Sequence, residues 1–253
     1  MPTALHLSPH PDDEGLGAPV TLLLLVSRGW RVVNLACSLG RAEQHARRRR
    51  ELGESCRRLG LESEVVQPPV AMSVGAGDDL DAARRELAGS IASALARLSP
   101  TLLIGPAPSD AHPAHAMVAS AAADALTPGP APARWWQWSL WSDHPSPNLI
   151  TPVSPEHLEA ARHALEAHAG ELARTDYRTL LRARAEVAGA VADERVFGFG
   201  SRRERSLPPA PRPMLAELLC DLERDDGPWR PRPPRLLDAD TPLGRKLTPG
   251  PDR

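Results

Sequence analysis

Short apolar segments alternate with longer amphipathic ones along the first half of the chain, and this alternation strongly constrains the fold. Four short runs have the apolar composition of buried strands, at residues 4–8, 31–37, 64–67 and 101–105. Three longer runs between them have helical spacing, at residues 18–29, 42–59 and 79–98. Strands that alternate with helices form parallel βαβ units. The sequence therefore predicts an α/β fold, a Rossmann-like open and mostly parallel sheet with helices on both faces.

The second half of the chain is less regular. Further elements are predicted there, a tryptophan-rich strand at residues 134–140 and helices at residues 155–169 and 176–190. From Ser206 onward the chain is crowded with proline, which favours irregular structure, and one short apolar helix is predicted at residues 214–222. We therefore expect one domain over residues 1–205 and an irregular, proline-rich C-terminal extension over residues 206–253 that packs on the same domain.

Charge, cysteine content and hydropathy exclude several classes of protein. The formal net charge of −2 provides no general attraction to nucleic acid. The three cysteines form no CxxC pair, and their odd number argues against a disulfide framework. The longest apolar run, residues 20–26, is too short to span a bilayer. The sequence thus predicts a cytoplasmic protein with no membrane span and no nucleic-acid partner, and it does not indicate an oligomeric state.

Histidine and carboxylate residues gather in two loops of the predicted sheet. The first loop, Pro9–Glu14 (PHPDDE), follows the first strand, and the second, Asp110–His115 (DAHPAH), follows the fourth. In open parallel sheets, ligands bind in the crevice beyond the carboxyl ends of the strands. We therefore expect both loops to lie on the same rim of the sheet and to form one site.

The residue types in these loops suit a catalytic metal centre. Catalytic zinc sites usually have three protein ligands, drawn from His, Asp and Glu, and one open position. His10, Asp13 and His115 can supply such a set. Asp12 is left over and can accept a proton from the attacking water as general base. His112 can stabilise an oxyanion or protonate the leaving amine, with Asp110 as its possible partner.

These two motifs resemble those of the PIG-L/LmbE-like family of zinc-dependent de-N-acetylases. The members of that family act on N-acetylglucosamine-containing lipids, thiol-sugar conjugates and antibiotic precursors. Residues 48–60 and 195–200 also look like segments of the family, so the resemblance touches roughly the first 200 residues. One departure is Ala114, because many members have an aspartate there, in HPDH; this chain lacks that possible support for His112.

The resemblance implies a role for each matching residue. It implies zinc ligation by His10, Asp13 and His115, with Asp12 as the general base and His112 as the electrostatic or acid catalyst. Taken singly, each histidine would more often have a structural or surface role. The acidic residues alone could cap a helix. The joint occurrence of the histidines and the acidic residues is what favours a metal site.

Two further residues are candidates for contact with the substrate. The run Arg47–Arg50 lies on a helix that also carries glutamates at favourable spacing, which is typical of a solvated face, yet Arg48 could grip an anionic part of a substrate. Alternation places Trp136 and Trp138 on one strand face, as core residues. Trp135 or Trp141 could instead line a groove and stack on a sugar; the substrate-binding prediction is Arg48 and Trp141.

The sequence thus predicts a zinc-dependent hydrolase that removes an N-acyl group, acetyl by resemblance, from an amino sugar or glycoconjugate in secondary-metabolite or thiol-sugar biosynthesis. A non-haem iron oxygenase is an alternative, because two histidines and one carboxylate also suit that metal. A non-catalytic binding protein on the same fold is the other. Substrate preference would depend on the loops at residues 68–77, 128–132 and 143–155.

Overall fold

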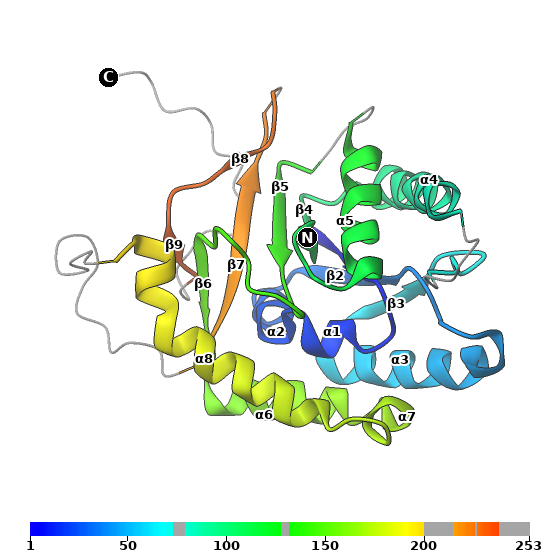
Figure 1. Cartoon of the computed structure of the whole chain (residues 1–253), viewed down its shortest axis with the longest axis horizontal. Helices are drawn as coiled ribbons and strands as arrows, with labels where there is room; N and C mark the ends of the chain where they lie inside the picture. Colours follow the sequence, from blue (N-terminus) through cyan, green and yellow to red (C-terminus); the bar gives the residue numbers. More distant parts are fainter. Residues whose placement is uncertain (73–78, 128–131, 200–214, 226, 238–253) are drawn as a thin grey trace.

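A sheet with helices on both faces forms the centre of the molecule (Figure 1). The computed structural model describes residues 1–72, 79–127, 132–199, 215–225 and 227–237. Its strands are β1 Thr3–Ser8, β2 Arg31–Ala36, β3 Glu62–Val65, β4 Leu102–Pro106, β5 Arg134–Trp138, β6 Leu149–Pro152, β7 Ala216–Glu223, β8 Arg230–Pro231 and β9 Arg235–Leu236. Its helices are α1 Asp13–Leu16, α2 Pro19–Ser27, η1 (a 3₁₀ helix) Ala42–Gln44, α3 His45–Leu59, α4 Leu80–Leu98, α5 Pro113–Leu126, α6 Pro155–Leu165, α7 Ala169–Leu172 and α8 Tyr177–Phe197.

The strand order confirms the predicted Rossmann-like fold. Over the described residues the sheet runs β3-β2-β1-β4-β5-β7-β6-β9, and β8 pairs with β7. The first five strands of this order are parallel to one another. The chain moves outward from β1 through β2 to β3 and then returns to the other side of β1 with β4, so the order reverses between β1 and β4. This reversal point is where such sheets bind ligands.

The last part of the sheet corrects one prediction. Residues 214–222 were predicted as a short helix, but Ala216–Glu223 is strand β7, which pairs antiparallel with both β5 and β6; Met214 lies outside the described residues. A short apolar run fits either structure, and here the open edges of β5 and β6 require a partner. The side chain of Glu217 on β7 also accepts hydrogen bonds from the backbone N–H groups of Val20 and Thr21, at 2.8 Å each. This contact caps the N-terminus of α2.

Three other elements differ in extent from the sequence prediction. The helix predicted at residues 155–169 ends at Leu165, and the separate short helix α7 begins at Ala169. Strand β6 lies inside the segment 143–155 that was expected to be a loop. Helix α8 continues to Phe197, beyond the predicted end at residue 190. The break before α7 matters most, because His168 in this break pairs with Glu14, and Glu171 of α7 pairs with Arg48 of α3. The boundary placed at residue 205 stays a prediction, since residues 200–214 lie outside the described part of the chain.

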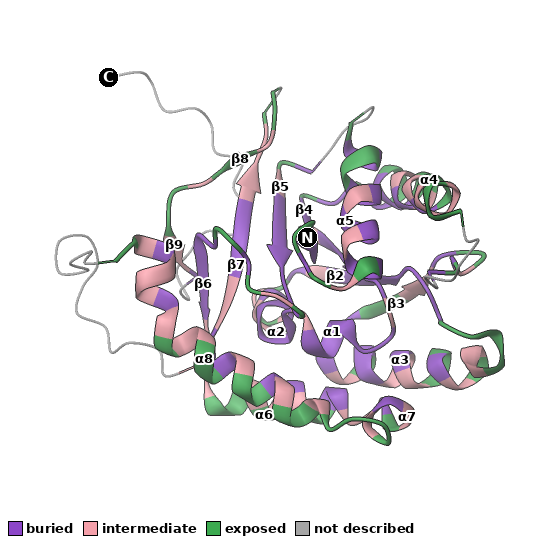
Figure 2. Ribbon diagram, in the orientation of Figure 1, coloured by how far each residue is buried: buried purple, intermediate pink, exposed green. Residues whose placement is uncertain are grey.

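Two apolar cores lie on opposite faces of the sheet, and the central strands are buried between them (Figure 2). Trp136 and Trp138 belong to the core that includes α2, α3 and α6, which confirms their predicted core role. Trp135 points to the other core, beneath α4 and α5, and is 4% exposed. The suggestion that Trp135 lines a groove is therefore wrong, because alternation along β5 buries it on the opposite face.

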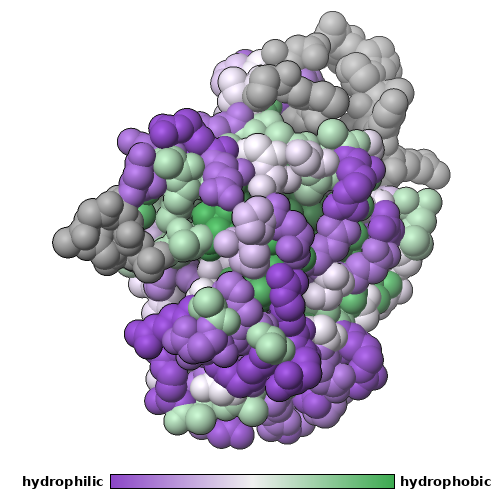
Figure 3. Space-filling model, turned by 90° about the vertical axis from the view of Figure 1, so that its right-hand side faces the viewer, coloured by the Kyte–Doolittle hydropathy of each residue, from purple (hydrophilic) through white to green (hydrophobic). Residues whose placement is uncertain are grey.

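The surface of the described residues is largely hydrophilic. Figure 3, which faces the right-hand side of Figure 1, shows hydrophilic residues over most of its lower part. Arg49 and Arg50 of α3 are exposed, so this part of the basic run faces solvent as predicted. Within the described ranges, every helix is too short or too polar to span a lipid bilayer.

We expect Gly17→Ala to lower the free energy of unfolding by about 1–3 kcal/mol, as overpacked cores do. The φ of Gly17 is −66°, which alanine adopts easily, but its Cβ would lie 2.6 Å from the ring of the buried Trp138. Gly53→Ala is the matched control, because Gly53 lies within α3 and a Cβ there meets no atom within 4 Å. That change is expected to stabilise by about 0.5–1 kcal/mol. Urea unfolding measures both, and equal stability of the two variants would contradict the packing argument.

Candidate active site and metal centre

The two histidine-containing loops meet at the point where the strand order reverses. The first loop follows β1 and leads into α1, which begins at Asp13. The second follows β4 and leads into α5, which begins at Pro113 with His112 as its N-cap residue. Because β1 and β4 are adjacent and parallel, their carboxyl ends lie side by side. Topology thus brings residues about 100 positions apart in sequence to one place.

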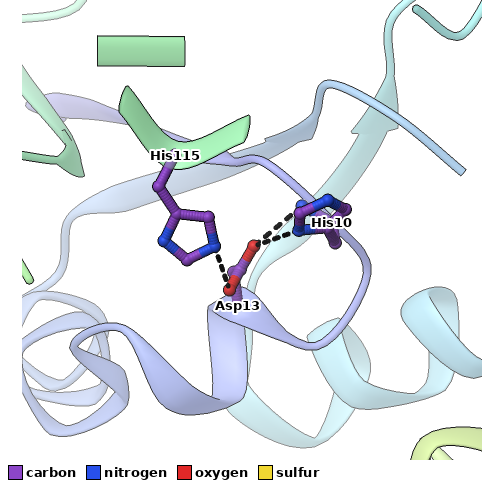
Figure 4. Close-up of side chains that lie close together, drawn as sticks. All are labelled: His10, Asp13 and His115. Atoms are coloured by element: carbon purple, nitrogen blue, oxygen red, sulfur yellow. Dashed lines mark hydrogen bonds and ion pairs between the residues drawn. The ribbon is translucent and has the colours of Figure 1, made fainter. Parts of the chain in front are cut away.

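His10, Asp13 and His115 converge, with the carboxylate of Asp13 between the two imidazoles (Figure 4). Oδ2 of Asp13 lies 3.4 Å from Nδ1 of His10 and also accepts the backbone N–H of His10 at 2.8 Å. Oδ1 of Asp13 lies 3.4 Å from Nε2 of His115. One ligand atom from each residue lies within 4.8 Å of the others. Burial opposes ionisation of Asp13, but the nearby His115 and His10 lower its pKa below the ordinary range.

Asp110 contacts the Nδ1 side of the His115 ring, opposite the Nε2 that faces Asp13. Its Oδ2 lies 3.5 Å from Nδ1 of His115 and accepts the backbone N–H of Leu140 at 2.6 Å. Asp110 was expected as a possible partner of the His112 side chain, but its Oδ1 accepts only the backbone N–H of that residue, at 2.9 Å. A carboxylate on Nδ1 of His115 leaves Nε2 free to face Asp13, the arrangement that metal-binding histidines commonly have.

His112 faces the same site without belonging to the ligand set. Its ring centre lies 4.8 Å from that of His115 and 5.1 Å from that of His10. Nδ1 of His112 accepts the backbone N–H of Ala114 at 3.2 Å, so the neutral ring carries its proton on Nε2. Burial, together with His115 and His10, lowers the pKa of His112, which favours this neutral form. His112 is therefore suited to donate a hydrogen bond through Nε2.

Asp12 has an uncommon backbone conformation and a perturbed side chain. It precedes α1 with a φ of 121°, which is rare for any residue with a Cβ. Its residue exposure is 9%. Burial, reinforced by the charges of Asp13 and Glu14, raises the pKa of Asp12 well above its ordinary value. A raised pKa makes the ionised carboxylate a stronger proton acceptor.

A buried pair that the sequence analysis did not identify holds this conformation. Oε2 of Glu14 accepts the backbone N–H of Asp12 at 3.1 Å, and Oε1 lies 2.5 Å from Nε2 of His168. Both Glu14 and His168 are fully buried. Glu14 is the last residue of the PHPDDE motif, and this position was a sequence signal that it contributes to the site. His168 is a lone histidine between two helices, and no local pattern indicates its partner.

Removing either member of this pair is expected to lower the free energy of unfolding by about 3–5 kcal/mol, because the other is left buried and alone. We expect Glu14→Ala and His168→Ala to cost less together than the sum of the two, since they act on one interaction. Arg162→Ala is the control; it removes the solvent-accessible ion pairs of Arg162 with Glu159 and Glu166 and should cost about 1 kcal/mol or less. Urea unfolding with a chelator present measures all four variants, and additive losses would refute the coupling.

The three residues of the ligand set line one cavity together with Asp12 and His112. Its wall also contains Leu16, Leu140, Trp141, Glu171, Arg174 and Tyr177. Trp141 is 43% exposed and lies in the wall as the sequence analysis placed it. Arg48 is not among the lining residues; it is buried and pairs with Oε1 of Glu171 at 2.5 Å. Of the loops expected to shape the pocket, residues 73–77 and 128–131 lie outside the described residues.

The donor set fits a divalent transition metal. Two imidazoles and one carboxylate match catalytic zinc sites with an open fourth position. The carboxylate is buried between the rings, and the far nitrogen of His115 faces a second carboxylate. This arrangement keeps Asp13 charged and orients the imidazole, as a bound cation requires.

A family model described as PIG-L, GlcNAc-PI de-N-acetylase, matches residues 5–126, which include both loops. Residues 5–126 are thus similar to the PIG-L family. No curated protein matches the chain. The matched region runs from within β1 to the end of α5 and contains all of the residues in the proposed ligand set.

Solved structures with the same fold extend the likeness over most of the chain. The zinc-inhibited form of teicoplanin deacetylase Orf2 is 18% identical, with a TM-score of 0.64, covering 89% of this chain and 100% of that one. N,N′-diacetylchitobiose deacetylase from Pyrococcus horikoshii is 19% identical, with a TM-score of 0.62, covering 87% and 84%. The 4-carboxy-2-hydroxymuconate hydratase from Pseudomonas putida KT2440 is 18% identical, with a TM-score of 0.61, covering 90% and 99%. At these identities the likeness shows a shared fold.

Proposed function

We propose that the protein is a zinc-dependent amide hydrolase that removes an N-acyl group, acetyl in the simplest case, from an amino sugar or glycoconjugate. The main support for this proposal is one cavity that contains His10, Asp13 and His115 together with two residues outside this ligand set, Asp12 and His112. The description of the PIG-L family and the printed names of two structural neighbours support deacetylation. The three free, buried cysteines support a reducing, cytoplasmic setting.

The chain's own residues divide the chemistry among them. His10, Asp13 and His115 would hold the metal, which when bound polarises the amide carbonyl and makes water a better acid. Asp12 takes the proton from water as the water oxygen attacks the carbonyl carbon. Nε2–H of His112 donates a hydrogen bond to the carbonyl oxygen as that atom gains negative charge. When the carbon–nitrogen bond breaks, Asp12 returns the proton to the leaving nitrogen, which yields a free amine and a carboxylic acid.

Hydrolysis is tested by offering purified protein loaded with zinc a panel of N-acetylated amino sugars and glycoconjugates, and measuring the amine released. Protein loaded with iron forms the second arm, because an oxygenase would consume oxygen with iron and leave the amide intact. A third arm offers unsaturated carboxylic acids, since one neighbour of the same fold is a hydratase. Amine release with zinc supports the proposal, and oxygen uptake or hydration in place of amine release would overturn it.

We expect His112→Ala to lower kcat by about 10²–10³-fold with little change in KM, as the loss of one oxyanion donor does. The reason is that Nε2–H of His112 would act on charge that develops only in the transition state. His112→Gln keeps a side-chain donor and should recover part of the loss. Steady-state kinetics of metal-loaded protein measures both variants. If KM instead rose by about the same factor and kcat stayed unchanged, His112 would only bind substrate.

A further inference from the structure

An aromatic pair and an arginine form the mouth of the active-site cavity. Trp141, Tyr177 and Arg174 all line it. The rings of Trp141 and Tyr177 meet edge to face, with centres 6.2 Å apart, and the ring of Trp141 lies 6.3 Å from that of His112. Trp141 is 43% exposed, whereas Trp136 and Trp138 are buried. Trp141 therefore presents an apolar surface to solvent at the edge of the reacting groups, a position suited to stacking on a sugar ring.

The charges beneath this mouth are unequal. Three arginines, Arg47, Arg48 and Arg174, surround the buried carboxylate of Glu171, at 3.7, 2.5 and 2.7 Å. Glu51 neutralises one of them through its ion pair with Arg47, at 2.6 Å. Glu171 is already paired with the buried Arg48, so the positive charge of Arg174 is in excess within this cluster. The side chain of Arg174 is also 70% exposed, while that of Arg48 is 9% exposed. Among these five residues the excess positive charge thus lies at the solvent side of the cavity, whereas the carboxylates of Asp12 and Asp13 lie in its buried wall.

The cavity itself is small. Its volume, 160 Å³, is below the about 300–1,000 Å³ of pockets that enclose a whole ligand. The acyl group and the reacting amide fit the interior, and the rest of an amino sugar or glycoconjugate must extend across the mouth. It would then pass over Trp141 and Tyr177 and reach the guanidinium of Arg174.

We propose that this mouth is a subsite for an anionic substituent, so that the preferred substrate is an N-acylated amino sugar that carries a phosphate or a carboxylate. The proposal rests on the proposed function for the identity of the reacting group. Arg174 supplies charge-assisted hydrogen bonds to the anion, and Trp141 and Tyr177 supply the platform for the ring. The pair of Glu171 with Arg174 orients the guanidinium without cancelling its charge.

The test compares substrates that share one sugar ring. N-acetylglucosamine is the neutral member, its 1-phosphate and 6-phosphate carry a phosphate, and N-acetylmuramic acid carries a carboxylate. We expect kcat/KM to be about ten- to a hundredfold higher for at least one anionic sugar, the gain that a hydrogen bond to a charged group typically brings. The higher kcat/KM should come from a lower KM for the anionic sugar. Arg174→Gln should abolish this preference by raising KM for the anionic sugar. Arg182→Gln is the matched control, since Arg182 is a similarly exposed arginine paired with Glu186 on α8; it should keep the preference.

A binding measurement separates this proposal from the hydrolytic one. Calorimetry of zinc-loaded Asp12→Asn protein with N-acetylglucosamine 6-phosphate, its 1-phosphate, N-acetylmuramic acid and the neutral sugar needs no turnover. Tighter binding of an anionic sugar that is lost with Arg174→Gln supports the subsite even if the wild-type protein releases no amine. Amine release at equal kcat/KM from neutral and anionic sugars, unaltered by Arg174→Gln, would overturn the subsite and leave hydrolysis standing. Absence of both binding and turnover would overturn both.

Discussion

Asp12→Asn is expected to lower kcat by about 10²–10⁴-fold, the usual contribution of a general base, while the protein keeps its metal and its fold. Asparagine has the same size and can accept the same hydrogen bonds, but it cannot take a proton from water. It is also the right replacement for the backbone, because Asp12 has a φ of 121° and asparagine tolerates positive φ better than alanine does. Steady-state kinetics, metal analysis and thermal unfolding of the same preparation measure the three properties.

The position of Asp12 explains why its loss should act on chemistry alone. Its carboxylate lines the cavity beside the ligand set, yet it is not one of the three groups whose atoms converge. Asp143→Asn is a suitable control, because Asp143 is an exposed aspartate that pairs with Arg195 away from the ligand set. That variant should retain its kcat. If the Asp12→Asn protein kept more than about a tenth of wild-type kcat with its metal bound, the base would have to be another group.

The second large effect concerns the metal. His115→Ala is expected to lower metal affinity by more than about 100-fold, because loss of a ligand exceeds the 10- to 100-fold cost of losing a group behind one. Nε2 of His115 faces Asp13, and the residue is 1% exposed, so the substitution removes a buried ligand from the set. Activity on any substrate should be lost together with the metal. Zinc should raise the melting temperature of wild-type protein and leave that of the variant unchanged.

Variants of two neighbouring residues serve as comparisons for this prediction. His112→Ala removes an imidazole of the same cavity that lies outside the ligand set, and it should keep its metal. Asp110→Asn should reduce metal affinity by about 10–100-fold, because it weakens the group that orients His115. Competition with a chromophoric chelator measures the affinities. Loss of metal from His112→Ala and retention in His115→Ala would reverse the assignment of the two histidines.

The sequence predicted the parts of the fold that depend on local pattern. Alternating apolar runs placed β1, β2, β4 and β5 and the helices α2, α3 and α4, because periodicity follows directly from which faces are buried, whereas the alanine-rich helix α5 was not predicted. The two loops could be assigned to one rim because parallel strands share the direction of their ends. The short run Ala216–Glu223 could not be assigned in this way. Its strand structure depends on hydrogen bonds to β5 and β6, which lie more than 60 residues earlier in the chain.

The same limit applies to side chains around the site. Arg48 was considered for a substrate because an arginine on a helix has no visible partner in sequence, and the structure pairs it with Glu171, 123 residues away. Trp135 and Trp141 looked equivalent, but one is packed against a core and the other is open to solvent. Glu14 and His168 meet across 154 positions. Contacts of His168 with the first loop and of α7 with α3 bring these charged groups together.

By itself the sequence determined the order of the strands of the first half of the chain with helices α2, α3 and α4 between them, and the residue types available at the ends of β1 and β4. These follow from local preferences and from the direction of parallel strands. The tertiary structure decided which charged groups pair, which tryptophan faces solvent, and how β7 completes the sheet. Those outcomes depend on contacts between distant segments, and burial makes an unpaired polar group too costly to leave alone.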